Sequence, residues 1–133
     1  MSTHQNKDVA KTLLRKAEED EQTVALIRAA NGPWGVGCFH CQQAAEKRLK
    51  AVLALHQDTF PRTHDIDMLI SLAEPYCAAL HDLPDEVLLL GDYAVGVRYD
   101  DVMIVDEATF QDNQTWLQLI KDALATLNME DEL

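Results

Sequence analysis

The sequence contains no long hydrophobic run, because its longest uninterrupted run of Val, Leu and Ile reaches only from Val87 to Leu90. A helix that crosses a bilayer needs about 20 consecutive apolar residues. The polar start MSTHQNKDVAK also has none of the hydrophobic core of a signal peptide. We therefore expect no membrane segment, and we expect a cytoplasmic protein.

Basic residues are scarce in the last third of the chain. Up to His81 there are nine Lys and Arg against ten Asp and Glu, whereas from Asp82 onward there are two against thirteen. The formal net charge is -12. Such a surface repels phosphate backbones, so the composition argues against generic duplex binding and predicts that DNA is not a ligand.

Cysteine is also sparse, with only Cys38, Cys41 and Cys77 in the chain. A structural zinc site wants four ligands, and no second pair accompanies Cys38 and Cys41. All three fall on apolar positions of expected helices, so we expect reduced, buried thiols and no metal site. The sequence further lacks a glycine-rich phosphate loop, a dinucleotide fingerprint and an H-E-x-x-H motif.

Hydrophobic residues make up 47% of the 133 residues, which suits one domain able to bury a core without staples. No repeat, low-complexity tract or linker interrupts it. We therefore expect a single domain over residues 1–133, with its core at about 7–128.

The chain is organised around residues 37–56, where apolar side chains recur at helical spacing on two sides. These positions are Cys38, Cys41, Ala44, Ala45, Leu49, Ala51, Val52 and Leu55. The remaining face carries Gln43, Glu46, Lys47 and Lys50, and it predicts an exposed i to i+4 ion pair between Glu46 and Lys50. A helix that is apolar on two sides belongs in the middle of a bundle.

Four further helical segments surround this one. The first, residues 7–30, has an apolar stripe interrupted at Asp20 and Glu21, which suggests that its middle protrudes or pairs with another chain. A third, with an apolar face over residues 66–80, should kink or split at Pro75. Residues 86–97 are predicted as a fourth helix, with a strand as the competing interpretation, and residues 110–127 as the last. The expected fold is all-α, an up-and-down bundle of about five helices.

Three motifs carry a family resemblance: FHCQQAAEKRLKAVLALH, then PRTHDIDMLISLAE, then DYAVGVRYDD. Over residues 7–127 the chain resembles the HEPN family, the "higher eukaryotes and prokaryotes nucleotide-binding" domain. The resemblance implies the same helical bundle and, as in many relatives, a homodimer. It also implies a small nucleotidyltransferase as partner, in a toxin–antitoxin-like pair.

Ribonuclease members of that family carry an arginine, four to six residues, and then a histidine. None of Arg15, Arg28, Arg48, Arg62 and Arg98 has a histidine at that spacing. Arg48 and His56 have seven residues between them, and Arg62 and His64 are too close together. We therefore assign no catalytic residue, and an enzyme is the less favoured interpretation.

The candidate nucleotide- or anion-binding residues are five, and each has a structural alternative. His64 and Arg62 precede the third helix, where Thr63 and Asp65 could instead serve only as capping residues. Arg98 and Tyr99 form the corner after the fourth helix, with Tyr93 as a further stacking surface, and Arg98 could simply clamp Asp100 or Asp101. Lys47 belongs to a basic cluster with Arg48 and Lys50. The residues are Arg62, His64, Lys47, Arg98 and Tyr99.

Three functions remain open at this point. The leading hypothesis is a non-catalytic module that binds a nucleotide such as ATP or GTP, without a fixed cofactor, and acts with the nucleotidyltransferase. The first alternative is a metal-independent ribonuclease that uses an atypical pair, Arg48 with His56 or Arg62 with His64. The second is a structural oligomerisation adaptor.

Overall fold

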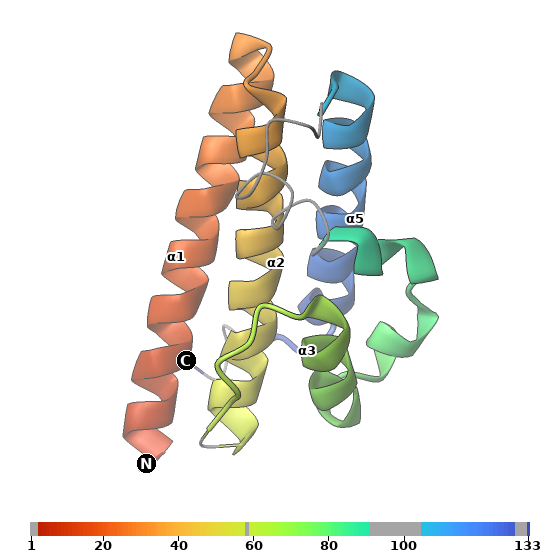
Figure 1. Cartoon of the computed structure of the whole chain (residues 1–133). Helices are drawn as coiled ribbons and strands as arrows, with labels where there is room; N and C mark the ends of the chain where they lie inside the picture. The colour runs from red at the N-terminus through yellow and green to blue at the C-terminus, as the bar shows by residue number, and fades with distance from the viewer. Residues whose placement is uncertain (1–2, 58, 91–104, 130–132) are drawn as a thin grey trace.

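The computed structural model describes residues 3–57, 59–90, 105–129 and 133 (Figure 1). Its four α-helices are α1 (Thr3–Ala30), α2 (Trp34–Gln57), α3 (Ile66–Ala73) and α5 (Glu107–Ala125). Three short 3-10 helices follow α3: η1 (Glu74–Tyr76), η2 (Ala78–Asp82) and η3 (Asp85–Leu89). The part of the chain described here holds no strand, and the prediction of an all-α bundle is confirmed.

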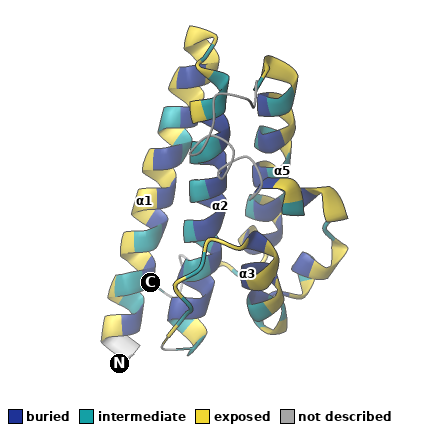
Figure 2. Ribbon diagram, in the orientation of Figure 1, coloured by how far each residue is buried: buried dark blue, intermediate teal, exposed yellow. Residues whose placement is uncertain are grey.

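Helix α2 lies in the middle of the bundle, with α1 along one side and α5 along the other (Figure 1). Helix α3 also packs on α2, and η2 and η3 pack on α5. Half of the residues of α2 are buried, including Cys38, Cys41, Leu49 and Val52 at 0% exposure (Figure 2). The sequence therefore identified the central helix correctly from its two apolar sides.

Helix α2 begins at Trp34, three residues before the predicted start, because its first turn packs on α5. The rings of Trp34 and Phe110 lie 5.1 Å apart between centroids. At Gly37 a Cβ atom would lie 2.3 Å from Cε1 of Phe110, closer than real contacts allow. Glycine at this position thus lets the Phe110 ring lie directly against the α2 backbone.

The third helix splits where Pro75 was expected to break it. Helix α3 ends at Ala73, and η1, which contains Pro75, takes over. Proline lacks the N–H that an α-helix would use and its ring crowds the preceding turn. The apolar face nevertheless continues, since Cys77 and Leu80 are buried beyond the break.

The predicted fourth helix, residues 86–97, differs from the structure where it can be compared. Residues Asp85–Leu89 form a 3-10 helix, and residues 91–104 lie outside the described part of the chain. In a 3-10 helix, positions i and i+3 fall on the same side. That geometry buries both Val87 and Leu90, at 2% and 0% exposure.

Among the described residues no helix is both long and apolar enough to span a bilayer.

Candidate functional site

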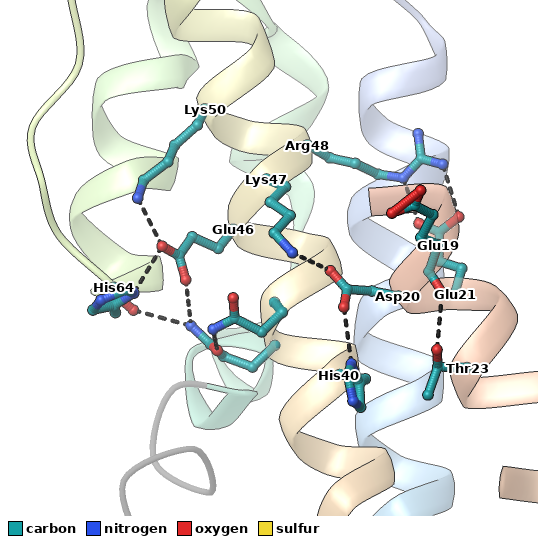
Figure 3. Close-up of polar contacts among 12 residues, drawn as sticks. Glu19, Asp20, Glu21, Thr23, His40, Glu46, Lys47, Arg48, Lys50 and His64 are labelled. Carbon is teal, nitrogen blue, oxygen red and sulfur yellow. Dashed lines mark hydrogen bonds and ion pairs between the residues drawn. The ribbon is translucent and has the colours of Figure 1, made fainter. Parts of the chain in front are cut away.

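Glu46 is the centre of a polar cluster between α2 and the connection that precedes α3. Its carboxylate accepts hydrogen bonds from Lys50 Nζ at 2.7 Å, His64 Nδ1 at 2.8 Å and Gln42 Nε2 at 2.9 Å (Figure 3). Glu46 is only 4% exposed. The predicted Glu46–Lys50 pair therefore exists, but the prediction that it lies on an exposed surface is wrong.

The cluster is buried because Gln42 and Glu46 continue a row of buried positions along α2. The row runs at steps of four and three through Gln42, Glu46, Leu49 and Leu53, and Gln42 is 0% exposed. Gln42 satisfies its own amide by accepting from Gln43 Nε2 at 2.9 Å and donating to the His64 carbonyl at 3.4 Å. Polar groups that are buried this deeply must be hydrogen-bonded, and here their partners attach the connection to α2.

The ring of His64 is exposed, but the Glu46 carboxylate that it contacts is buried. Its side chain is 74% exposed, whereas that of Glu46 is 5% exposed. A carboxylate oxygen accepts, so Nδ1 of His64 carries the proton of this bond and Nε2 is left for a ligand. The buried carboxylate thereby fixes the orientation of an imidazole that reaches outward.

Thr63 and Asp65 bind backbone donors at the start of α3. Asp65 caps the helix and accepts from the Met68 N–H at 3.3 Å, and Thr63 Oγ1 accepts from the Asp65 N–H at 3.1 Å. The structural alternative for Thr63 and Asp65 is thus observed. The side chains of His64 and Arg62 are exposed beside this helix start.

Lys47 is engaged with α1. Its Nζ donates to Asp20 Oδ2 at 2.6 Å, and His40 Nδ1 contacts Asp20 Oδ1 at 2.8 Å (Figure 3). Asp20 is 8% exposed. The interruption of the apolar stripe at Asp20 is therefore an internal contact to α2, and the suggestion that this part of α1 protrudes is wrong, whereas the alternative of pairing with another chain stays a prediction.

Arg48 completes the pairing of the basic cluster. Its guanidinium binds both oxygens of Glu21, with Nη2 at 2.8 Å, and Lys121 Nζ reaches Glu21 at 3.2 Å. Burial alone would raise the pKa of Glu21, but the hydrogen bond and charge of Arg48, aided by Lys121, hold it below its ordinary value. Lys47, Arg48 and Lys50 are thus each bound to a carboxylate, which speaks against an anion site built from these three.

We expect this lowered pKa to make stability depend on Glu21 at acid pH. Because the folded-state pKa lies below the unfolded value of about 4.5, the stabilisation is complete above that pH and disappears as pH falls through the folded-state pKa. Midpoints of thermal unfolding between about pH 7 and pH 3 should fall less steeply for Glu21→Gln than for the wild type. Parallel curves would contradict the assignment.

The remaining candidate residues separate into two groups. Arg98 and Tyr99, with Tyr93, lie outside the described residues. His56 stacks on Tyr76 of η1, with ring centroids 4.8 Å apart, whereas Arg48 binds Glu21 of α1. Arg48 and His56, the atypical catalytic pair of the ribonuclease hypothesis, therefore contact different elements, α1 and η1 respectively.

The three cysteines lie in the core as free thiols. Burial raises the pKa of Cys38 and of Cys41 to about 12, so both stay protonated at neutral pH. Cys77 Sγ donates to the Ala123 carbonyl at 3.3 Å. In residues 3–57, 59–90, 105–129 and 133, no three His, Cys, Asp or Glu side chains gather as metal ligands.

The sequence interpretation missed the buried residues Gln42 and Asp20, and the half-buried Glu21, as parts of the site. The available signal was positional: Gln42 and Glu46 share a row with buried leucines, and Asp20 falls within the stripe between Ala17 and Val24. A charged residue at an apolar position indicates a paired, buried charge as readily as a protruding one.

Comparison with known families supports the resemblance noted from the three motifs. The family model described as the HEPN domain matches residues 10–131, nearly the whole chain. No curated protein matches the sequence.

Proposed function

The chain belongs to the HEPN domain family, and from this we propose that it is a non-catalytic binding module that acts with a small nucleotidyltransferase. In this proposal the module is a homodimer, the pair is toxin–antitoxin-like, and the partner supplies the catalysis. The site takes the phosphate of a nucleotide such as ATP or GTP.

The observation that carries the proposal is the internal pairing of the basic residues on α2. Lys47, Arg48 and Lys50 each bind a carboxylate within 2.8 Å. A catalytic arginine or lysine must be available to the charge that develops on the substrate. Cations that are already engaged in ion pairs, two of them between α2 and α1 and one within α2, suit a scaffold that binds through other residues.

Nucleotide binding is proposed for His64, Arg62, Arg98 and Tyr99. The fixed, exposed ring of His64 supports its part, since Nε2 can donate to a phosphate oxygen once it is protonated. Arg62 is exposed two residues earlier and adds a permanent positive charge. Lys47 is left out of this site because Asp20 holds it at 2.6 Å.

A metal-independent ribonuclease that uses Arg62 and His64 is the second candidate. The bond from His64 Nδ1 to buried Glu46 is the arrangement that orients a histidine for proton transfer in many hydrolytic sites. Binding and cleavage then depend on the same histidine, and the experiment below separates them.

The first arm of that experiment tests the partner. Affinity-tagged protein is co-expressed with a small nucleotidyltransferase encoded next to it, and the eluate is analysed by size-exclusion chromatography. We expect the two proteins to co-elute as one complex. Separate elution at micromolar concentration would contradict the partnership, since stable protein pairs of this kind bind more tightly.

The second arm tests the ligand by calorimetric titration with ATP, GTP and a short single-stranded RNA. We expect saturable nucleotide heat that Arg98→Ala removes and that His64→Ala weakens by about 10- to 100-fold, as for a hydrogen bond to a charged group. His81→Ala is the matched control, because that ring is also exposed and lies 3.5 Å from Glu74. RNA cleavage that His64→Ala abolishes would replace this proposal by the ribonuclease.

A further inference from the structure

A pocket lies between α1 and α5. Both helices pack on α2, from two sides, and among the described residues they are not themselves a closely packed pair (Figure 1). A hollow of about 400 Å³ remains between them, with Leu14 of α1, Arg48 of α2 and Lys121 of α5 in its lining. This volume falls in the range of small-ligand sites, so the pocket can hold a small molecule.

The pocket and the cluster around Glu46 lie on different sides of α2. Arg48 follows Glu46 by two residues, which corresponds to about 200° around a helix. Figure 3 shows the two side chains leaving α2 toward opposite sides, Glu46 toward His64 and Arg48 toward Glu21 of α1. A ligand in the pocket is therefore separate from one bound at His64.

Two cations meet at one wall of the pocket. Arg48 Nη2 and Lys121 Nζ contact the same oxygen of Glu21, at 2.8 Å and 3.2 Å, so the two nitrogen atoms are at most 6.0 Å apart. One carboxylate thus compensates for two cations, and these three side chains carry a net formal charge of +1. An ammonium group has three N–H donors, and the contact of Lys121 with Glu21 uses one. This wall can therefore receive an anion.

Asp122 also lines the pocket, but its charge acts on it weakly. Asp122 is exposed and accepts a hydrogen bond from Gln118 at 2.8 Å, so water and salt screen its carboxylate. The side chains of Arg48 and Lys121 are 17% and 30% exposed, and partly buried charges are screened much less. The field in the pocket is therefore set by Arg48, Lys121 and Glu21, and it favours a negative charge.

The rest of the wall is aliphatic. Leu14, Leu124 and Met129 line it, with 9%, 4% and 8% of their surfaces exposed. Methionine adapts its shape to the group that it contacts. None of the described residues that line the pocket is aromatic, so a nucleobase would have no ring to stack on. The pocket therefore suits an aliphatic chain better than the base of a nucleotide.

We propose that this pocket binds a short aliphatic carboxylate, with its head group at Lys121 and its chain against Leu14, Leu124 and Met129. A net charge of +1 at the wall matches a monoanion, whereas a phosphate monoester carries nearly two negative charges at neutral pH. The ligand class and the site both go beyond the proposed nucleotide function and do not depend on it.

An NMR titration of the isotope-labelled protein with octanoate tests the site and the ligand class. We expect saturable shifts of the backbone amides of Arg48 and of residues 121–125, and none at His64. Acetate, which lacks the chain, and octan-1-ol, which lacks the charge, should each bind at least about tenfold more weakly. The absence of saturable shifts with octanoate, or equal binding of acetate or octan-1-ol, would overturn the proposal.

Two substitutions on α5 test the geometry. Ala125 lines the pocket and is exposed, so Ala125→Trp should fill the hollow and abolish octanoate binding without loss of the wild-type circular dichroism. Ala108→Trp is the matched control, because Ala108 is an exposed alanine of the same helix and should leave binding unchanged. Octanoate affinity that survives in a folded Ala125→Trp variant would overturn the site.

The head group is tested by Lys121→Ala. We expect octanoate affinity to fall by about 10- to 100-fold, as for the loss of a hydrogen bond between charged groups. Lys16→Ala is the control, since Lys16 is an exposed cation of α1 and should leave affinity unchanged. Equal affinity of Lys121→Ala and the wild type would overturn the assignment of the head group.

Competition separates this proposal from the nucleotide site. We expect His64→Ala to bind octanoate like the wild type, and ATP to leave the octanoate shifts in place. Displacement of octanoate by ATP would overturn the assignment of the pocket to an aliphatic ligand. Failure of nucleotide binding alone leaves the octanoate result standing, so the two proposals fail distinguishably.

Discussion

Replacing Phe110 with alanine is expected to lower the free energy of unfolding by about 3–5 kcal/mol, as large-to-small changes at fully buried aromatics do. Phe110 is 1% exposed and packs on the ring of Trp34. It also occupies the space beside Gly37 where any other residue would place a Cβ atom. Its removal leaves a cavity between the first turn of α2 and α5. The measurement is the urea midpoint, with the slope unchanged.

A double-mutant cycle with Gly37→Ala makes this assignment specific. In the wild type the added methyl group meets the Phe110 ring, and we expect a loss of about 1–3 kcal/mol from overpacking. In the Phe110→Ala background the same methyl enters the cavity and should cost little or stabilise, since alanine is the better helix former. Costs that simply add would show that Gly37 and Phe110 do not share this space.

The bundle could be predicted from the sequence because its determinants are local. The two apolar sides of α2 are visible as a period in one stretch, and Pro75 breaks a helix whatever surrounds it. Glu46 could not be understood in the same way. The cation at i+4, Lys50, suggests an exposed pair, but Glu46 is 4% exposed and its further partner His64 comes from another segment.

This difference between local determinants and contacts between distant segments also explains why the predictions for Asp20 and for the segment after Pro84 were wrong. The basic residue at helical spacing from Asp20 on α1 is Lys16, whereas the observed partners of Asp20, Lys47 and His40, lie on the neighbouring helix. Residues 85–89 are helical, as the pattern indicated, but whether such a short segment is α or 3-10 depends on which residues meet α5. Tertiary contacts decide both outcomes, and a single sequence does not display them.

Glu46→Ala is expected to lower the free energy of unfolding by about 3–5 kcal/mol, because it leaves one partner of a buried ion pair without compensation. The ammonium of Lys50, whose side chain is 12% exposed, and the buried amide of Gln42 both lose their acceptor. Glu46→Gln should cost less, since its oxygen can still accept. Asp122→Ala is the control, because that carboxylate accepts from Gln118 on an exposed face and should change stability by less than about 0.5 kcal/mol.

Combining Glu46→Leu with Lys50→Met separates the cost of an unpaired charge from the value of the pair. Replacing a whole buried ion pair by apolar side chains of similar volume is often neutral, so we expect the double variant to recover most of the stability that Glu46→Ala loses. His64 would then keep its exposure without the carboxylate that orients it, and nucleotide heat should weaken although the fold is intact. Full nucleotide binding in a stable double variant would show that Glu46 serves the fold alone, whereas weakened binding would make it a positioning residue for His64.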